Sequence, residues 1–299
     1  MAKFSTDPIL DRFAEQVYAR LVRDLCTPLP ESFREIPYGV SFKVILPGEK
    51  EFPVALYHSE KKGFSVVTQS ERVRRLILGL LAPEALAGCD EAGKGDIFGP
   101  LVTACFYLCD GSRGALELGV RDSKRMGDDE VLAAADELDR RSRRFFEVVR
   151  IMPKRYNELY ADFKKKGRTL NHLLAWAHGK ALSTLAGRHP DMRQVLVDQF
   201  SDAPALVATI RAAAPDAEVE FRPRAEAHPA VALASVVARA DYLRSLKKLS
   251  DETLKGEFAL RSGSGADADA RIAAIRARHG DAVFAGLAKL HFANFSRER

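Results

Sequence analysis

The chain has 299 residues, of which 46% are hydrophobic and 29% charged, as expected for a soluble globular protein with one or two domains. Basic residues outnumber acidic ones by 46 to 41, and this net charge of +5 suits a polyanion such as nucleic acid without identifying one. The start lacks a signal-peptide pattern, and the longest apolar stretch, residues 76–89, is too short and too polar to cross a bilayer. The four cysteines lack zinc-type spacing, and we expect reduced, mostly buried thiols of a cytoplasmic protein.

The first part of the chain predicts a small α+β unit. Apolar residues recur at helical spacing over residues 8–25, and Pro28 and Pro30 are expected to end that helix. Short strands are predicted over residues 38–46, 52–57 and 64–68, and a basic helix over residues 71–80. Pro83 marks a plausible linker, so the predicted domains are residues 1–82 and 83–299.

The second part predicts a mixed sheet flanked by helices, an α/β architecture, because strands first adjoin and then alternate with helices. The predicted strands are residues 87–91, 101–108, 144–151, 194–200 and 218–223. The predicted helices are residues 128–138, 170–185, 202–214 and 229–249, and one that begins near Asp281 after a loop at residues 263–265.

Carboxylates stand at the ends of three of these strands. Asp90 and Glu91 end one, Asp198 ends an apolar run, and Glu226 follows another. A charge inside an apolar strand costs several kcal/mol unless it is paired or binds a metal. Taken alone, Asp198 is more typical of a strand-end or capping carboxylate, so only a fold that gathers these acids gives them a shared role.

Clustered carboxylates repel one another, and divalent cations remove that penalty. Oxygen ligands without nearby histidine or cysteine spacing favour Mg²⁺ or Mn²⁺ over zinc. Two such ions about 3.5–4 Å apart would stabilise the attacking and leaving oxygens of phosphodiester hydrolysis.

A flexible turn, Gly93-Lys94-Gly95, follows the first two acids directly. Glycine lets backbone amides and carbonyls come close to a sugar-phosphate chain. By itself the pattern is equally typical of a hairpin turn.

Several motifs together resemble the type 2 ribonucleases H, and in particular the ribonuclease HIII branch. Residues 88–100 (GCDEAGKGDIFGP) resemble the family's opening motif, with the GKG form that is typical of the HIII branch. The other similar segments are DSK at 122–124, Asn171 with LAWAH at 174–178, VDQF at 197–200, Glu226 with VALASVVAR at 231–239, and KLHFAN at 289–294.

The resemblance covers residues 85–295 well and implies an RNase H-like fold. It implies that Asp90, Glu91, Asp198 and Glu226 form an acidic quartet, which is catalytic and binds Mg²⁺ or Mn²⁺. It also implies that Gly93, Lys94 and Gly95 bind the substrate and read the 2′-hydroxyl. Ser123 and Lys124 are predicted phosphate contacts, and residues 1–82 are more loosely similar to a TATA-binding-protein-like substrate-binding domain.

The function that the resemblance implies is an endonuclease that cuts the RNA strand of RNA/DNA hybrids by two-metal-ion hydrolysis, leaving 5′-phosphate and 3′-hydroxyl ends. We expect a monomer whose partner is the hybrid duplex, with no membrane or protein partner. One alternative is HII-like cleavage at single ribonucleotides in duplex DNA; another is a nucleic-acid-binding protein with a vestigial site. Departures from the family pattern, such as Gly179 and Gly263-Ser264-Gly265, put substrate contacts in doubt but not the quartet.

Overall fold

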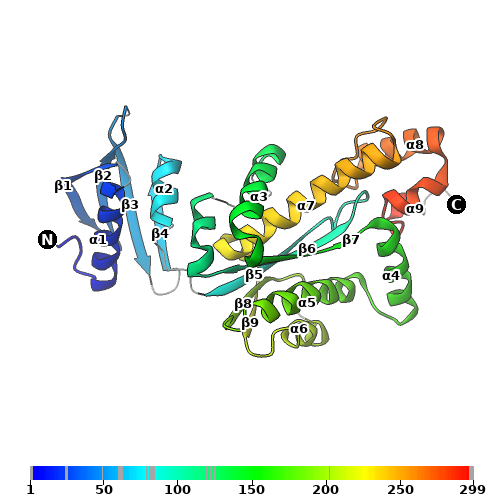
Figure 1. Ribbon diagram of the computed structural model, residues 1–299, viewed down its shortest axis with the longest axis horizontal. Helices are drawn as coiled ribbons and strands as arrows, with labels where there is room; N and C mark the ends of the chain where they lie inside the picture. The colour runs from blue at the N-terminus through cyan, green and yellow to red at the C-terminus, as the bar shows by residue number, and fades with distance from the viewer. Residues whose placement is uncertain are drawn as a thin grey trace. The chain divides into compact units, whose positions relative to one another are not determined.

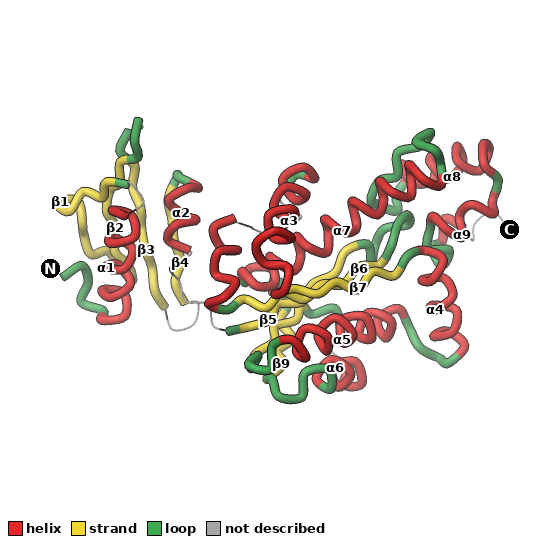
Figure 2. Tube along the Cα trace, viewed as in Figure 1, coloured by secondary structure: helices red, strands yellow, loops and turns green. Residues whose placement is uncertain are grey.

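The structure is a computed structural model, which describes residues 3–23, 26–48, 50–59, 63–78, 80, 85–118, 120, 123, 126–201 and 203–295. The chain divides into two compact units (Figures 1 and 2). The first comprises Met1–Pro83 and Arg113–Gly119, and the second comprises Glu84–Ser112 and Val120–Arg299. Within the described ranges, no helix is both long and apolar enough to span a membrane.

The first unit is a four-stranded antiparallel sheet with two helices. Its elements are α1 (Pro8–Arg23), β1 (Thr27–Ile36), β2 (Gly39–Ile45), β3 (Phe52–Ser59), β4 (Gly63–Thr68) and α2 (Glu71–Leu78), with strand order β1-β2-β3-β4. Phe13 and Val17 of α1 pack with Phe42 and Val54 of the sheet in one buried core. The three-strand prediction was wrong because β1 contains Pro28 and Pro30. An edge strand tolerates proline, since one side of its backbone pairs with no neighbour.

The second unit is built on a five-stranded mixed sheet with strand order β7-β6-β5-β8-β9. The strands are β5 (Leu86–Ala92), β6 (Leu101–Leu108), β7 (Phe146–Ile151), β8 (Gln194–Asp198) and β9 (Glu218–Arg222). β5, β6 and β7 pair antiparallel, whereas β8 lies parallel to both β5 and β9. The predicted mixed sheet is confirmed.

Helices cover both faces of this sheet (Figure 1). α7 (Pro229–Thr253) lies on one face with α3 (Asp128–Ser142) packed against it, and α5 (Leu170–Arg188) and α6 (Pro204–Arg211) lie on the other. Gly88 lets α7 approach β5 closely, because a Cβ atom at this position would stand 2.3 Å from the Val231 nitrogen. The start of α7 is thereby held against the strand that carries Asp90 and Glu91.

The sequence patterns missed two helices of the second unit. These are α4 (Pro153–Lys165) and α8 (Ala266–His279), whereas the short α9 (Phe284–Leu287) lies in the predicted C-terminal helix. Only Pro153 and Tyr156 of α4 are buried, and α8 follows a Gly/Ser-rich loop in a polar segment, so neither presents a clear apolar stripe. Near Asp281, where we predict a helix start, the chain forms a 3-10 turn that leads into α9.

Candidate active site

The ends of two parallel strands bring Asp90 and Asp198 together. The register of β5 and β8 pairs Cys89 with Val197, and Asp90 and Asp198 are the next residues of the two strands. Neighbouring strands lie about 4.8 Å apart, so these carboxylates share one edge of the sheet. The negative charge of Asp198 acts on Asp90, which indicates that the two groups are neighbours.

Glu226 reaches the same edge through the turn after β9. Arg224 adopts a left-handed backbone conformation with φ of 57°, and Ala225–Ala227 form a 3-10 turn. The amide of Ala225 donates a hydrogen bond to Asp198 Oδ1 at 3.0 Å. Glu226 is the next residue, so the turn carrying it is fastened to Asp198.

Asp90 and Glu91 point to opposite faces of β5, as consecutive strand residues do. Asp90 is hydrogen-bonded to the Ser235 hydroxyl of α7. Glu91 lies on the other face, where its Oε2 is 3.3 Å from Nε2 of the buried His178 of α5. One helix on each face therefore supports one of the two adjacent acids.

The electrostatics of the cluster indicate a place for cations. Burial, together with the neighbouring negative charges of Glu91 and Asp198, raises the pKa of Asp90 to about 7. Although burial opposes ionisation of Glu91, the hydrogen bond and charge of His178 hold its pKa below the usual value. Hard carboxylate oxygens that repel one another fit a divalent ion such as Mg²⁺ or Mn²⁺, whose charge would keep Asp90 ionised.

The glycine-rich turn begins beside these acids. Gly93 has a φ of 85°, and a Cβ atom there would stand 2.2 Å from the Pro100 carbonyl oxygen, so a side chain does not fit. Gly95 is exposed, and a Cβ atom there would meet nothing within 4 Å, so its backbone is open to a ligand. The Lys94 ammonium is 3.6 Å from Glu91 Oε1 and 5.5 Å from the centre of the Phe200 ring.

The Lys289 side chain holds the loop that follows the turn, at residues 96–99. This buried side chain donates hydrogen bonds to the carbonyls of Asp96 at 2.8 Å and Gly99 at 2.7 Å, and a longer one to Phe98 at 3.4 Å. Tyr242 of α7 also donates to the Phe98 carbonyl, at 3.1 Å. Three backbone carbonyl oxygens thus replace the water molecules that would hydrate an exposed lysine side chain.

Ser123 is buried and its hydroxyl is 2.7 Å from the Ser235 hydroxyl, the group that contacts Asp90. In this position it supports the acid cluster from inside the unit. The phosphate contact predicted for Ser123 stays a prediction, and Lys124 lies outside the described residues.

Two side chains at the site were not predicted as functional. His178 lies in the LAWAH segment and Lys289 begins KLHFAN, but neither spacing nor charge indicated a contact with the first motif. A lone histidine on an otherwise buried helix face, and a lone lysine among apolar residues, were the available signals.

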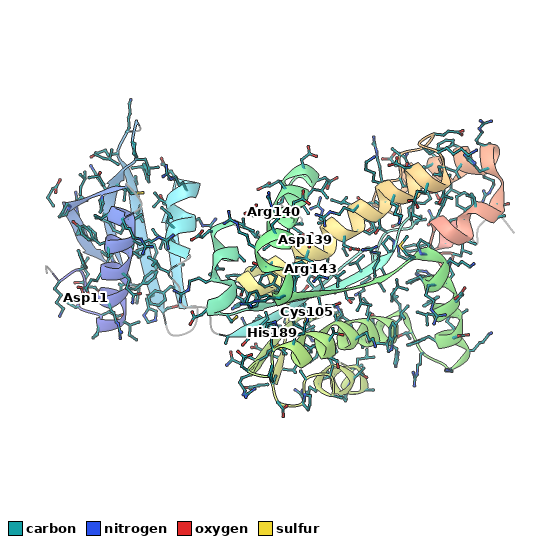
Figure 3. The ribbon with its side chains drawn as sticks, viewed as in Figure 1. Asp11, Cys105, Asp139, Arg140, Arg143 and His189 are labelled. Carbon is teal, nitrogen blue, oxygen red and sulfur yellow. The ribbon has the colours of Figure 1, made fainter. Side chains whose placement is uncertain are left out.

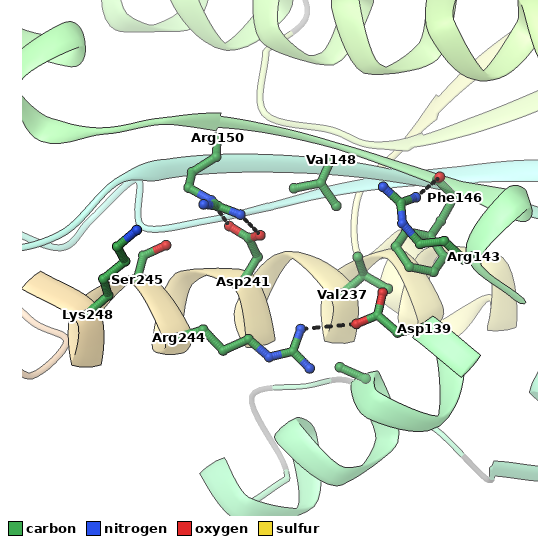
Figure 4. A pocket seen from close by; sticks show the side chains of 11 residues that line it. Asp139, Arg143, Phe146, Val148, Arg150, Val237, Asp241, Arg244, Ser245 and Lys248 are labelled. Atoms are coloured by element: carbon green, nitrogen blue, oxygen red, sulfur yellow. Dashed lines mark hydrogen bonds and ion pairs between the residues drawn. The ribbon is translucent and has the colours of Figure 1, made fainter. Parts of the chain in front are cut away.

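A cavity of about 350 Å³ lies elsewhere, between α3, β7 and α7 (Figure 4). Two of its arginines pair with acids: Arg150 binds both carboxylate oxygens of Asp241 at 2.6 Å, and Arg244 lies 3.3 Å from Asp139. None of the quartet acids lines it. The cavity is therefore separate from the candidate site at the strand ends.

Known proteins match this chain over most of its length. The sequence model of the family described as Ribonuclease HII matches residues 87–295. Ribonuclease HIII of Protochlamydia amoebophila is 34% identical over 206 residues, which are 69% of this chain and 65% of that protein. Ribonuclease HIII of Chlamydia abortus is 32% identical over 260 residues, which are 80% of this chain and 82% of that protein.

Solved structures agree with the architecture. The crystal structure of Bst-RNase HIII in complex with Mn²⁺ is similar with a TM-score of 0.63 and 23% identity, covering 94% of each chain. Aquifex aeolicus RNase H3 is similar with a TM-score of 0.55 and 24% identity, covering 94% of this chain and 96% of that one. These likenesses confirm the RNase H-like fold. With the family match and the curated relatives, they show that the chain belongs to the type 2 ribonuclease H family of RNA-cleaving nucleases, on its ribonuclease HIII branch.

Proposed function

We propose that this enzyme cuts the RNA strand of RNA/DNA hybrids, with Asp90, Glu91, Asp198 and Glu226 as ligands of Mg²⁺ or Mn²⁺. The observation that carries the proposal is the meeting of Asp90 and Asp198 at one sheet edge, with the Glu226 turn tied to Asp198. The raised pKa of Asp90 supports a cation there, because a buried carboxylate among like charges needs a positive partner.

A pair of bound ions would activate the attacking water and stabilise the leaving oxygen, giving 5′-phosphate and 3′-hydroxyl ends. The chain's own residues keep the ligands in place. Ser235 holds Asp90 from the α7 side, and His178 holds Glu91 from the α5 side. Such outer contacts orient ligand carboxylates and support their geometry.

The turn at residues 93–95 would select RNA over DNA. The backbone at Gly95 is open, and a 2′-hydroxyl can both donate and accept hydrogen bonds. Lys94 stands beside Glu91 and would bring a positive charge to a phosphate near the acids. The proposed cleavage therefore requires a 2′-hydroxyl next to the scissile phosphate.

The test is metal-dependent cleavage by Asp90→Asn and Asp198→Asn, with Asp139→Asn of the separate cavity as the matched control. Asparagine keeps the shape of aspartate but loses the charge that retains the cation. We expect both quartet variants to lose hydrolysis while binding the hybrid, and the control to cut normally. Near wild-type activity in either quartet variant would contradict the ligand assignment.

The substrate is tested on the wild-type enzyme with four duplexes: a continuous hybrid, a single ribonucleotide within DNA, a hybrid with 2′-O-methyl groups around the cut, and plain DNA. We expect cleavage of the first and resistance of the third. Preferential cleavage of the second would favour the HII-like alternative, and equal cleavage of plain DNA would exclude recognition of the 2′-hydroxyl.

A further inference from the structure

Two cysteines and a histidine meet in the core of the second unit, beside the acidic quartet. Cys89 of β5 and Cys105 of β6 are directly opposite in the antiparallel register, with their sulfur atoms 2.6 Å apart (Figure 3 labels Cys105). One ligand atom from each cysteine and one from His178 all lie within 4.8 Å of one another. All three side chains are fully buried.

The pleat of β5 explains why this cluster adjoins the site. Cys89 and Glu91 are two residues apart, so both point to the face covered by α5. His178 of that helix faces both: Nε2 is 3.3 Å from Glu91 Oε2, and the other ring nitrogen remains for the sulfurs. That nitrogen, Nδ1, is buried without a hydrogen-bond partner among the described residues.

We propose that Cys89, Cys105 and His178 form a binding site for a thiophilic cation, with Zn²⁺ as the ion it would take. Two sulfurs and an imidazole nitrogen are the donors that zinc prefers, and they differ from the oxygen donors of the quartet. Zn–S distances of about 2.3 Å place two sulfur ligands about 3.8 Å apart, so the sulfur atoms would separate by about 1 Å. Binding releases two protons to solvent, one from the Cys105 thiol and one shared by Cys89 and His178, so both sulfurs bind as thiolates and Nδ1 binds through its lone pair.

The contact with Glu91 completes a known type of metal environment. A histidine that binds a metal through one ring nitrogen commonly donates the proton of the other to a carboxylate, which fixes the ring. Glu91 already occupies that position. A zinc ion at the thiols would therefore fix the His178 ring and, through it, the position of Glu91.

This site is not visible in the sequence because its ligands are far apart in the chain. Cys105 lies sixteen positions after Cys89, and His178 lies seventy-three positions after Cys105. Pairing of β5 with β6 brings the sulfurs together, and packing of α5 on the sheet supplies the imidazole.

The test uses Co²⁺ as a spectroscopic probe of the reduced, metal-free, full-length protein in excess Mg²⁺, which occupies carboxylate sites. Cobalt bound to thiolates absorbs by sulfur-to-metal charge transfer, whereas cobalt bound to carboxylates lacks this band. We expect the band to saturate at one Co²⁺ per chain and to be displaced by Zn²⁺. Cys89→Ser and Cys105→Ser should abolish it and His178→Ala should weaken binding at least tenfold, whereas Cys109→Ser, outside the cluster, should retain it.

Asp198→Asn separates this proposal from the nuclease assignment. It should retain the charge-transfer band, because the thiol site shares no ligand with the quartet, even if the variant shows that the proposed catalytic role is wrong. Zn²⁺ should also raise the melting temperature of wild-type protein in Mg²⁺ but not that of folded Cys105→Ser protein. Absence of the band in reduced wild-type protein, or its survival in folded Cys89→Ser and Cys105→Ser proteins, would overturn the proposal.

Discussion

Of the two adjacent acids Asp90 and Glu91, Asp90 carries the larger electrostatic cost of ionisation. Its carboxyl is buried, it neighbours Glu91 and Asp198, and its pKa is raised from 3.8 to about 7. In the metal-free protein the folded state thus holds this proton more tightly than the unfolded chain. The contribution of Asp90 to stability is therefore present below pH 3.8 and is lost as the pH rises through about 7.

This pKa predicts competition between protons and metal ions. Below about pH 7 a proton on Asp90 blocks the oxygen that would bind the cation, so activity at limiting Mg²⁺ should rise as the pH increases through this range. A higher Mg²⁺ concentration should shift the midpoint of the pH–rate curve toward acid. Cleavage rates across pH at two Mg²⁺ concentrations measure this, and a midpoint that does not move would show that Asp90 does not bind the metal.

At the level of single residues, the sequence could predict the acids but not what holds them. Asp198 at the end of an apolar strand, and Asp90-Glu91 before a glycine turn, are visible as local anomalies. Ser235 and His178 are not, because their roles depend on the packing of α7 and α5 on opposite faces of the sheet. The burial of Ser123 likewise follows from tertiary contacts alone.

Among the elements, the loop at residues 96–99 depends most on a single distant side chain. Lys289 binds three of its carbonyl oxygens, and Gly263 fastens it further by donating to Asp96 Oδ1 at 2.6 Å. This loop directly follows the turn proposed to read the 2′-hydroxyl. Its position should therefore determine how well the substrate is gripped.

We predict that Lys289→Met lowers stability by about 1–3 kcal/mol, because buried carbonyls lose their donor. The variant should also raise KM for the hybrid more than it lowers kcat, since the loop positions substrate and contributes no metal ligand. Lys247→Met, which changes an exposed lysine of α7 that pairs with Asp251 at 2.8 Å, is the control. Thermal unfolding and steady-state kinetics measure both effects, and a variant as stable as the control would refute the role of Lys289.

Element prediction succeeded where the pattern was local and periodic. The helices that became α1 and α5 were predicted from recurring apolar residues, and the strand that became β8 from an apolar run. β1 was missed because it contains prolines, and α4 because its surface is mostly polar. α8 was missed because it follows a Gly/Ser-rich loop in a polar segment. Tertiary contacts stabilise these elements more than their own propensity does.

For the whole molecule, we propose that residues 1–82 supply affinity for the hybrid while the second unit supplies chemistry. The first unit contains none of the quartet acids. Deleting residues 1–82 should weaken hybrid binding, raise KM and leave turnover of bound substrate nearly unchanged, because the lost contacts are made equally in ground and transition states. Binding should also become less dependent on salt, since fewer phosphate contacts release counterions.

A substitution at Tyr38 tests the same role of the first unit in the full-length chain. Tyr38 is 85% exposed and has a φ of 60°, a conformation that asparagine accepts more readily. Tyr38→Asn should therefore retain or gain stability while it weakens hybrid binding, if the ring stacks on nucleic acid. Binding isotherms at several salt concentrations measure both variants. A folded truncation with unchanged affinity and salt slope would make the first unit a stabilising or docking module.

The acids at the site come from three places in the chain: residues 90–91, 198 and 226. No fragment that lacks the central pairing of β5 with β8 can gather them, so the capacity to bind metal appears only when the sheet is complete. Ions that bind the folded chain alone stabilise it by mass action, by about 2.7 kcal/mol at one hundred times the dissociation constant. The ions proposed to serve hydrolysis would therefore also stabilise the correctly paired sheet: a chain with misregistered strands would lack this stabilisation and unfold more readily than a correctly paired one.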